Sequence, residues 1–433
     1  MAYKNYTNVW GLSALLNDYA DLMTEYQAED IDDVMKDIAK TIEEGIGRLT
    51  ALPQNAELLR NEPDDLEAIR ALRPEGMRSF QKGLPADYEE RLSGALHGRM
   101  AGCLLGAIVE GFPIDDMQRW AKATGDAFPP VDYWKEAPGI PGTLRYWKSP
   151  VEDYTRGRMR FVPVDDDIIY TLIGLLIMEE FGKGFTTDDV GKSWLKYVPY
   201  GYTAEEAALR NLKNGIPGSQ AAVFHNPYVQ LIGADIRSDP WAYLAPGHPE
   251  LAAEFAYRDA RLTHRRNGVY GAMYFSAVES IAFCVDDPME ALRLGLAEIP
   301  AECWLARAVR WALDECVNIH TYMDARKAVD ERFPDMPIAH TINNACLTVF
   351  GIHLGGTDFT KVISETVAMG LDNDCTAATA GSIVGAVIGR KNIAGHWVKP
   401  FNNTICTYLN GIETMAIDDV LSRFRKQAEI IVR

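Results

Sequence analysis

The chain has too few basic residues for a surface that binds polyanions. Its 433 residues include 43 Lys and Arg against 61 Asp and Glu, so the formal net charge is −18. Nucleic acids and anionic membranes attract proteins through a positive field, which this composition lacks. We therefore predict no nucleic-acid partner and no membrane partner. An anionic ligand would need a local device such as a helix N-terminus, an arginine or a metal cation.

Cysteine pairs and long apolar runs are also missing. The seven cysteines are scattered without a CxxC pair, a pattern that favours reduced thiols over a disulfide framework. The longest weakly polar run, residues 375–389, is too short and too rich in Thr, Ser and Gly to span a bilayer. Asp18 and Asp21 interrupt the N-terminal region before an apolar stretch reaches signal-peptide length. These features predict a soluble, cytoplasmic protein, and they leave its oligomeric state open.

Alternating polar and apolar residues, which are typical of strands, are not evident either. Helical patterns dominate, so we predict an all-α fold. Residues 1–88 are expected to form an N-terminal helical extension, and residues 89–433 the main domain. In the extension, four apolar residues share one helix face: Val34, Ile38, Ile42 and Ile46.

Residues 113–163 form a loop insert of unusual composition. Its distinctive residues are prolines and aromatics: Pro129, Pro130, Pro138, Pro141 and Pro150, with Phe128, Tyr133, Trp134, Tyr146, Trp147 and Tyr154. A loop this long inside a compact protein is usually a lid, a binding loop or a disordered segment. The aromatics argue against disorder. Two interpretations stay open, a lid or binding loop, and an irregular loop pinned to the surface.

The first of three candidate clusters ends in a glutamate. Gly98, Gly102, Gly106 and Glu110 are each four residues apart, so a helix would place them on one face. Glycine inside a helix costs about 1 kcal/mol relative to alanine, and three on one stripe indicate close approach of another backbone. Glu110 would then stand at the C-terminal end, where the helix dipole disfavours a negative charge. It is either a carboxylate that needs a partner or a solvated glutamate.

The second cluster is a run of three aspartates, Asp165, Asp166 and Asp167, before a broad apolar helix. One aspartate can cap the helix. The other two would repel each other beside a buried helix unless a cation lay between them. Paired aspartates also occur at other expected helix starts, so capping and metal binding both remain open for this segment.

The third cluster contains Asp372 and Asp374, followed by Thr376 and by a helix with another stripe of glycines. A DxD pattern also occurs in phosphotransferases of the haloacid dehalogenase type, where it follows a strand. The segment before Asp372 looks helical instead, which counts against that alternative. Two acidic helix starts together with Glu110 supply hard oxygen ligands, which suit Mg²⁺ or Mn²⁺ rather than zinc.

Taken in order, these clusters resemble the motifs of the ADP-ribosylglycohydrolase family, an all-helical fold with a central two-metal site. Residues 98–110 are similar to the family's GxxxGDALGxPxE, with Cys103 at the aspartate and Ile108 at the proline. Residues 165–168 are similar to its TDDT, and residues 370–386 to its GGDTDTIAAIAGAIAGA. The likeness covers residues 92 to about 390 and leaves out the N-terminal extension and the insert.

The resemblance implies a role for each matching residue. It makes Glu110, Asp166 and Asp372 catalytic, and it places Arg237, His264 and Asn373 near the substrate. Its expected ligands for two Mg²⁺ or Mn²⁺ ions are Asp165, Asp166, Asp167, Asp372, Asp374, Cys375 and Thr376. Asp165 and Cys375 stand where the family has threonine ligands, and a thiol is a poor ligand for Mg²⁺. Cys375 therefore leaves open whether one metal or two are bound, with Thr376 as a substitute hydroxyl.

The implied activity is Mg²⁺-dependent hydrolysis of an N- or O-glycosidic bond at ribose C1, with an ADP-ribose conjugate as the expected substrate. Two alternatives remain open at this point. One is a glycoside hydrolase for a ribosyl or other furanosyl small molecule or nucleoside, because the altered motifs and the insert mark a divergent branch. The other is a non-catalytic module that binds ADP-ribose.

Overall fold

The computed structural model describes residues 3, 7–137 and 144–433. Contacts divide the chain into two compact units, Met1–Arg60 and Asn61–Arg433. The division falls earlier than the expected limit at residue 88, because the segment after Arg60 is tied to the larger unit. Arg73, for example, donates to Glu250 at 2.7 Å and to Glu298 at 2.5 Å.

The smaller unit contains the helices α1 (Thr7–Glu25) and α2 (Ile31–Thr50), and α3 (Ala56–Asn61) follows at the boundary. The helix predicted from the apolar spacing is α2. Asp32 and Asp33 stand in its first turn, where negative charge favours a helix start. Its apolar face includes Val34 and Ile42, which are exposed.

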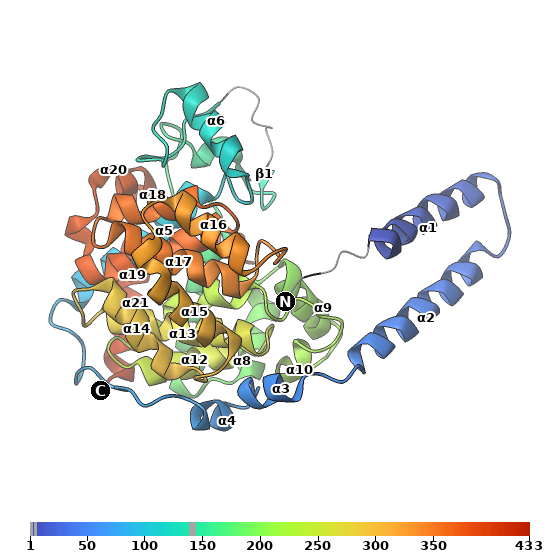
Figure 1. Cartoon of the computed structure of the whole chain (residues 1–433), viewed down its shortest axis with the longest axis horizontal. Coiled ribbons are helices and arrows are strands. Elements are labelled where there is room, and N and C mark those ends of the chain that lie inside the picture. Colours follow the sequence, from blue (N-terminus) through green and yellow to red (C-terminus); the bar gives the residue numbers. More distant parts are fainter. Residues whose placement is uncertain (1–2, 4–6, 138–143) are drawn as a thin grey trace. The chain divides into compact units, whose positions relative to one another are not determined.

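The larger unit is helical, which confirms the predicted all-α class (Figure 1). Its helices are α4 (Leu66–Ala71), α5 (Tyr88–Gly106), α6 (Ile114–Thr124), α7 (Asp166–Phe181), α8 (Thr187–Tyr197), α9 (Thr203–Lys213), α10 (Gly218–Ala221), α11 (Asp239–Leu244), α12 (Pro249–Ala260), α13 (Asn267–Ala282), α14 (Pro288–Gly295), α15 (Trp304–Glu315), α16 (Tyr322–Arg332), α17 (Thr341–Gly355), α18 (Phe359–Ala368), α19 (Asn373–Ile388), α20 (Gly395–Val398) and α21 (Ile417–Ile431).

Two short antiparallel hairpins were not predicted from the sequence. The strand β1 (Leu144–Arg145) pairs with β2 (Ser149–Pro150), and β3 (Thr404–Cys406) pairs with β4 (Thr414–Ala416). Strands of two or three residues are too short to show an alternating pattern. The β1–β2 hairpin lies in the insert and reaches the candidate site.

Helix amphipathicity separates an inner from an outer layer. The helices α7, α13, α17 and α19 are apolar around most of their circumference, and nearly all their residues are buried. Others, such as α8, α15 and α21, bury one face and expose the other to solvent. A helix without a polar face requires neighbours on all sides, so the first group forms the core.

The predicted glycine stripes pack α5 directly against α19. A methyl group on Gly98 would overlap the carbonyl oxygen of Gly381, and one on Gly102 would overlap that of Ala377. The prediction of close backbone approach is confirmed. The helices run antiparallel, so the end of α5 at Gly106 meets the backbone of Asp374 at the start of α19. The packing therefore brings the first and third sequence clusters together.

Aromatic side chains pin much of the insert to the helices. The Tyr133 hydroxyl donates to the Trp397 carbonyl at 2.7 Å, and the Trp134 ring nitrogen donates to the Leu105 carbonyl at 2.9 Å. Figure 1 shows α6 and β1 beside each other at one end of the larger unit. Pro138 and Pro141 of the insert lie outside the described residues.

All seven cysteines are free thiols. Within the described ranges, no helix combines the length and the apolar character that a bilayer crossing requires.

Candidate functional site

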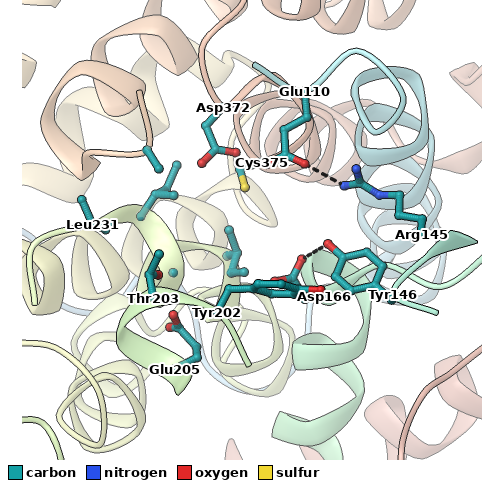
Figure 2. Close-up of a pocket in the computed structure, with 14 residues that line it drawn as sticks. Glu110, Arg145, Tyr146, Asp166, Tyr202, Thr203, Glu205, Leu231, Asp372 and Cys375 are labelled. Atoms are coloured by element: carbon teal, nitrogen blue, oxygen red, sulfur yellow. Dashed lines mark hydrogen bonds and ion pairs between the residues drawn. The ribbon is translucent and has the colours of Figure 1, made fainter. Parts of the chain in front are cut away.

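One cavity of about 330 Å³ collects the expected catalytic residues (Figure 2). Glu110, Asp166 and Asp372 all line it, although they come from three separate segments. The other polar and aromatic residues of its wall are Arg145, Tyr146, Tyr202, Thr203, Glu205 and Cys375. The starts of α7, α9 and α19 contribute to this wall, so the N-terminal ends of three helix dipoles point toward the cavity.

Glu110 reaches the cavity from a turn, not from a helix. The helix α5 ends at Gly106, four residues before the position predicted for its carboxylate. The chain turns where the backbone of Asp374 lies against Gly106, and the Gly111 amide then donates to the Leu371 carbonyl at 2.9 Å. This bond fixes the Glu110 turn beside the start of α19. The expected helical position of Glu110 is therefore wrong, but its predicted need for a partner is met.

That partner is Arg145, an insert residue that the sequence did not single out. Its Nη2 donates to Glu110, Asp165 and Asp374 at 3.0, 3.1 and 2.9 Å. Its Nη1 donates to the Ala107 carbonyl at 2.6 Å. One guanidinium from the insert thus joins carboxylates of all three predicted clusters.

The first two aspartates of the triple have separate roles. Asp165 caps α7 by accepting the Asp167 amide, as predicted for one member of the run. It also accepts from Arg145. Asp166 accepts the Tyr146 hydroxyl at 2.7 Å and faces the cavity (Figure 2). Asp166 is therefore held by a neutral donor, whereas Asp165 is held by a cation.

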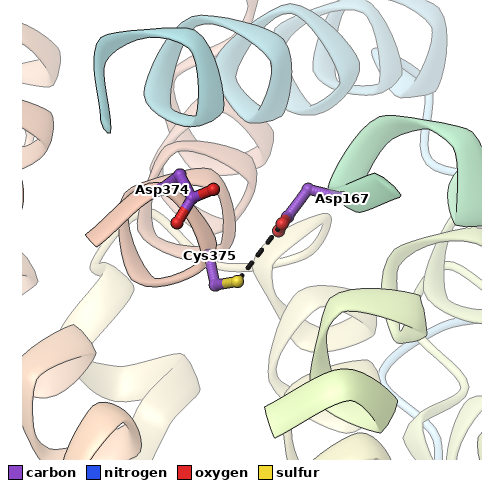
Figure 3. Close-up of side chains that lie close together, drawn as sticks. All are labelled: Asp167, Asp374 and Cys375. Carbon is purple, nitrogen blue, oxygen red and sulfur yellow. Dashed lines mark hydrogen bonds between the residues drawn. The ribbon is translucent and has the colours of Figure 1, made fainter. Parts of the chain in front are cut away.

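Asp167 points away from the cavity toward a buried arginine. Arg99 donates to its side chain at 3.1 Å and to its carbonyl at 2.7 Å, and it also contacts Asp239. The Cys375 thiol donates to the other Asp167 oxygen at 3.2 Å (Figure 3). Burial raises the pKa of the Cys375 thiol well above its ordinary value, which keeps it protonated as this donor.

Asp372 and Asp374 keep free oxygens that a cation could use. Oδ1 of each is buried, and no described residue supplies it with a hydrogen-bond partner. Oxygens of Glu110, Asp372 and Asp374 lie within 4.8 Å of one another. Three hard oxygen donors at this separation fit one divalent cation such as Mg²⁺ or Mn²⁺.

Burial makes the carboxylates of the cluster hard to ionise. Burial, together with nearby Glu110, raises the pKa of Asp372 to about 7. Burial also raises the pKa of Asp165 to about 6, although Arg145 opposes this shift. A cation beside these groups would favour their charged forms.

An aromatic wall faces the carboxylates. Tyr146 and Trp147, at the tip of the β1–β2 hairpin, have φ angles of 53° and 56°, which are strained for residues with a side chain. The Tyr200 hydroxyl holds the Tyr146 carbonyl at 2.8 Å, and the Tyr146 and Tyr202 rings lie 5.7 Å apart. The sequence drew attention to these insert aromatics without showing which of them reach the site.

Comparison with known proteins identifies the relatives of this chain. The model of the ADP-ribosylglycohydrolase family matches residues 84–429. The chain belongs to the ADP-ribosylglycohydrolase family. A solved structure described as an ADP-ribosylglycohydrolase-related protein complex shares its fold, with a TM-score of 0.55 and 19% identity over 81% of this chain and 100% of the other. A search of curated proteins gave no match.

Family membership makes the protein a glycohydrolase, and its acidic cluster could bind a metal.

The structure places two residues of the family's third motif away from the cavity. The Thr376 hydroxyl donates to the Asp372 carbonyl at 3.1 Å, and the Asn373 amide donates to the Val367 carbonyl at 3.0 Å. Neither Asn373 nor Thr376 is among the residues that line the cavity. The expected roles of Thr376 as a metal ligand and of Asn373 in substrate binding therefore stay predictions.

Arg237 and His264 also lie behind the cavity wall. Arg237 is buried and donates to Asp259 and Glu205, each at 2.7 Å. Nδ1 of His264 lies 2.6 Å from the Thr263 hydroxyl. Neither Arg237 nor His264 is among the residues that line the cavity, and Arg237 is engaged in buried ion pairs, so their expected substrate contacts stay predictions.

Glu205 is the cavity residue that sequence reasoning missed in this region of the glycohydrolase. Arg237 holds it at the wall, and burial raises its pKa to about 7. In the sequence, Glu205 and Glu206 resemble any acidic first turn of a helix. No local signal distinguishes the one that faces the cavity.

Proposed function

We propose that this protein hydrolyses the glycosidic bond at ribose C1 of an ADP-ribose conjugate with the help of a divalent cation. The observation that carries the proposal is the convergence of Glu110, Asp166 and Asp372 on one cavity in a chain of this family. Carboxylates on opposite sides of a small cavity are the groups that glycoside hydrolysis uses.

The residues that would hold the cation are Glu110, Asp372 and Asp374. Their mutual spacing and the unpartnered Oδ1 atoms of the two aspartates support this assignment. A bound Mg²⁺ or Mn²⁺ supplies Lewis acidity to oxygen ligands such as sugar hydroxyls and water.

The side chains of the cavity carry the remaining chemistry. Cleavage at C1 develops positive charge on the sugar ring, which the carboxylates of Asp166 and Glu110 stabilise. Arg145 holds Oε2 of Glu110 at 3.0 Å, and the Glu110 side chain is 44% exposed. Glu110 is thus fixed in direction and reachable by water, as required of a group that positions a water molecule beside the cation.

The aromatic wall provides a flat surface for the rest of the substrate. Tyr146 and Tyr202 line the cavity, and Trp147 packs edge-on against Tyr200 while remaining 68% exposed. Such rings bind a base or the apolar face of a sugar. We assign the insert hairpin to substrate selection for this reason.

A second candidate is hydrolysis of a smaller ribosyl or furanosyl compound without a diphosphate. The favouring observation is that, within the described part of the chain, the cavity lining offers a single cationic side chain, Arg145, which already contacts three carboxylates. A diphosphate would have to compete with these carboxylates. A compound with a neutral or cationic leaving group would not.

Mass spectrometry of reaction products separates these candidates. The substrates are ADP-ribosylated arginine and serine peptides, beside nucleosides and simple furanosides, each with Mg²⁺ or with EDTA. Free ADP-ribose that requires Mg²⁺ supports the first candidate, and release of an unphosphorylated sugar supports the second. Glu110→Gln should lower turnover by about 10²–10⁴-fold while the fold is retained. The control Glu331→Gln, at an exposed position outside the cavity lining, should keep wild-type turnover.

Either candidate requires hydrolysis. Tight binding of ADP-ribose without release of any product would contradict both, and it would identify a binding module.

A further inference from the structure

Arg145 occupies a built site among acidic residues. Its guanidinium contacts carboxylates from the turn after α5, from the cap of α7 and from the first turn of α19. The Arg145 side chain is only 16% exposed, and its partners Asp165 and Asp374 are 0% and 3% exposed. A cation so enclosed contributes a full positive charge to the cluster.

The ion pairs cover only part of the cluster. Six carboxylates meet there: Glu110, Asp165, Asp166, Asp167, Asp372 and Asp374. Arg145 and Arg99 pair with four of them. Among the described residues, Asp166 and Asp372 have no ion pair, and both line the cavity (Figure 2). The unbalanced charge therefore lies on the cavity side.

Two of the three carboxylates shared with Arg145, those of Asp374 and Glu110, keep one oxygen each for another cation. Asp374 uses Oδ2 for Arg145, whereas its Oδ1 is buried without a partner in the described part of the chain. Glu110 uses Oε2 for Arg145. The guanidinium and a metal ion can thus lie on opposite sides of the same carboxylates.

The chain accepts backbone strain to hold Arg145 in place. The next two residues, Tyr146 and Trp147, adopt positive φ angles that L-residues avoid. Hydrogen bonds from Tyr146 to Asp166 and from Tyr200 to the Tyr146 carbonyl fix the turn. Strain maintained by surrounding contacts is typical of functional sites.

We propose that Arg145 is a built-in cation that replaces one of two metal ions, so that the cluster binds a single divalent cation through Glu110, Asp372 and Asp374. The replacement also accounts for Asp165, which stands where the family motif has threonine. This carboxylate is in contact with Arg145 at 3.1 Å. The inference deepens the proposed function and rests on its use of a divalent cation.

Counting bound manganese ions tests directly whether Arg145 replaces a metal ion, and the count needs no substrate. The full chain is stripped with a chelator and titrated with Mn²⁺ alone, and bound ions are counted by calorimetry and elemental analysis. Electron paramagnetic resonance then distinguishes an isolated Mn²⁺ from a spin-coupled pair. We expect one isolated ion in the wild type and a coupled pair in Arg145→Gln.

Two further variants control for charge and for position. Arg145→Lys keeps a cation and should still bind one ion. Arg156→Gln removes an arginine of the same insert that pairs with Asp126 and Asp132, and it should also bind one. A wild-type stoichiometry other than one, or a stoichiometry that Arg145→Gln leaves unchanged, overturns the proposal.

A compensated variant covers the case in which Arg145→Gln fails to fold. Arg145→Gln with Asp165→Thr removes one charge of each sign, and threonine can still cap α7. This double variant should bind a pair of ions, and binding of one ion or none would overturn the proposal. Because metal counting does not depend on turnover, an inactive protein that gives the expected counts would reject the proposed substrate and leave the role of Arg145 standing.

Discussion

Two arginines neutralise the acidic cluster from opposite sides, and their surroundings differ. Arg99 comes from α5 inside the helical core, is fully buried, and contacts Asp167, Asp239 and two backbone carbonyls. Arg145 comes from the insert hairpin and lines the cavity. Arg99 pairs with two carboxylates that do not line the cavity, whereas Arg145's partners include residues proposed to bind metal. The same residue type therefore supports the fold in one place and shapes the site in the other.

The comparison also explains why the three neighbouring aspartates of α7 are not equivalent. Asp167 faces Arg99, Asp165 faces Arg145, and Asp166 faces the cavity. A buried carboxylate is tolerated only with a partner. The two outer members of the run are stabilised by arginines, which leaves the middle one available for ligands.

Removal of Arg99 should have the largest effect. Arg99→Met leaves Asp167 and Asp239 buried without their cation, and such a loss typically costs about 3–5 kcal/mol. We expect this decrease in the free energy of unfolding, measured by urea denaturation. Arg156→Gln, which breaks partly exposed pairs, should cost less than about 1 kcal/mol. Equal stability losses in the two variants would contradict a scaffold role for Arg99.

The contact between α5, which carries Arg99, and α19 should show the next largest effect. We call this contact the seam. A methyl group on Gly102 would overlap the Ala377 carbonyl, so Gly102→Ala should destabilise the fold by about 1–3 kcal/mol. Gly45→Ala in α2 is the matched control, because nothing lies within 4 Å of its added methyl group. The control should stabilise its helix by about 0.5–1 kcal/mol. Thermal unfolding of both variants checks that the two changes in stability have opposite signs. If Gly102→Ala raised stability instead, the seam would be loosely packed.

The cavity side should show a pH dependence of stability through Asp372. Asp372 has a pKa of about 7 in the fold against an ordinary value of 3.8. The folded state therefore binds this proton more tightly than the unfolded state, and stability is lost as pH rises from about 4 toward about 7. Without metal, the unfolding temperature should fall by at least about 2 °C over this range.

Asp372→Asn and added Mn²⁺ should each reduce this pH dependence. The amide cannot ionise, and the cation offsets the charge. If neither change alters the dependence of the unfolding temperature on pH, ionisation of Asp372 does not control that dependence.

Loss of the Tyr146 hydroxyl should have the smallest effect. Tyr146→Phe removes one hydrogen bond to Asp166, worth about 1 kcal/mol, so KM should rise by less than about tenfold. Tyr133→Phe removes a hydrogen bond that pins the same insert to Trp397, and it should lower stability without changing KM. Steady-state kinetics with the substrate identified by mass spectrometry would show the difference. If KM changes only in Tyr133→Phe, the insert affects KM through its attachment to Trp397 and not through the Tyr146 hydroxyl.

Local patterns predicted the scaffold of the site well. The glycine spacing in residues 98–106 predicted close backbone approach because a helix aligns every fourth residue, and the α5–α19 contact confirms it. The acidic runs at the starts of α7 and α19 were recognised because their motifs keep the family order. The position of Glu110 was predicted less well, because a tertiary contact ends α5 at Gly106.

Long-range partners could not be predicted. Arg145 and Asp374 are 229 positions apart, and nothing near either residue in the sequence indicates the other. Arg237 was expected near the substrate, yet its pairs with Glu205 and Asp259 form only after α9 and α12 pack against its segment. Charge pairing across a fold depends on topology, which single-sequence patterns do not encode.

The most direct test of the shared acidic cluster is anomalous diffraction from a crystal of the full chain soaked in Mn²⁺. We expect one manganese peak in contact with Asp372 and Asp374, with the Arg145 guanidinium still on Asp165. Two manganese peaks, with Arg145 displaced from Asp165 and Asp374, would contradict the account.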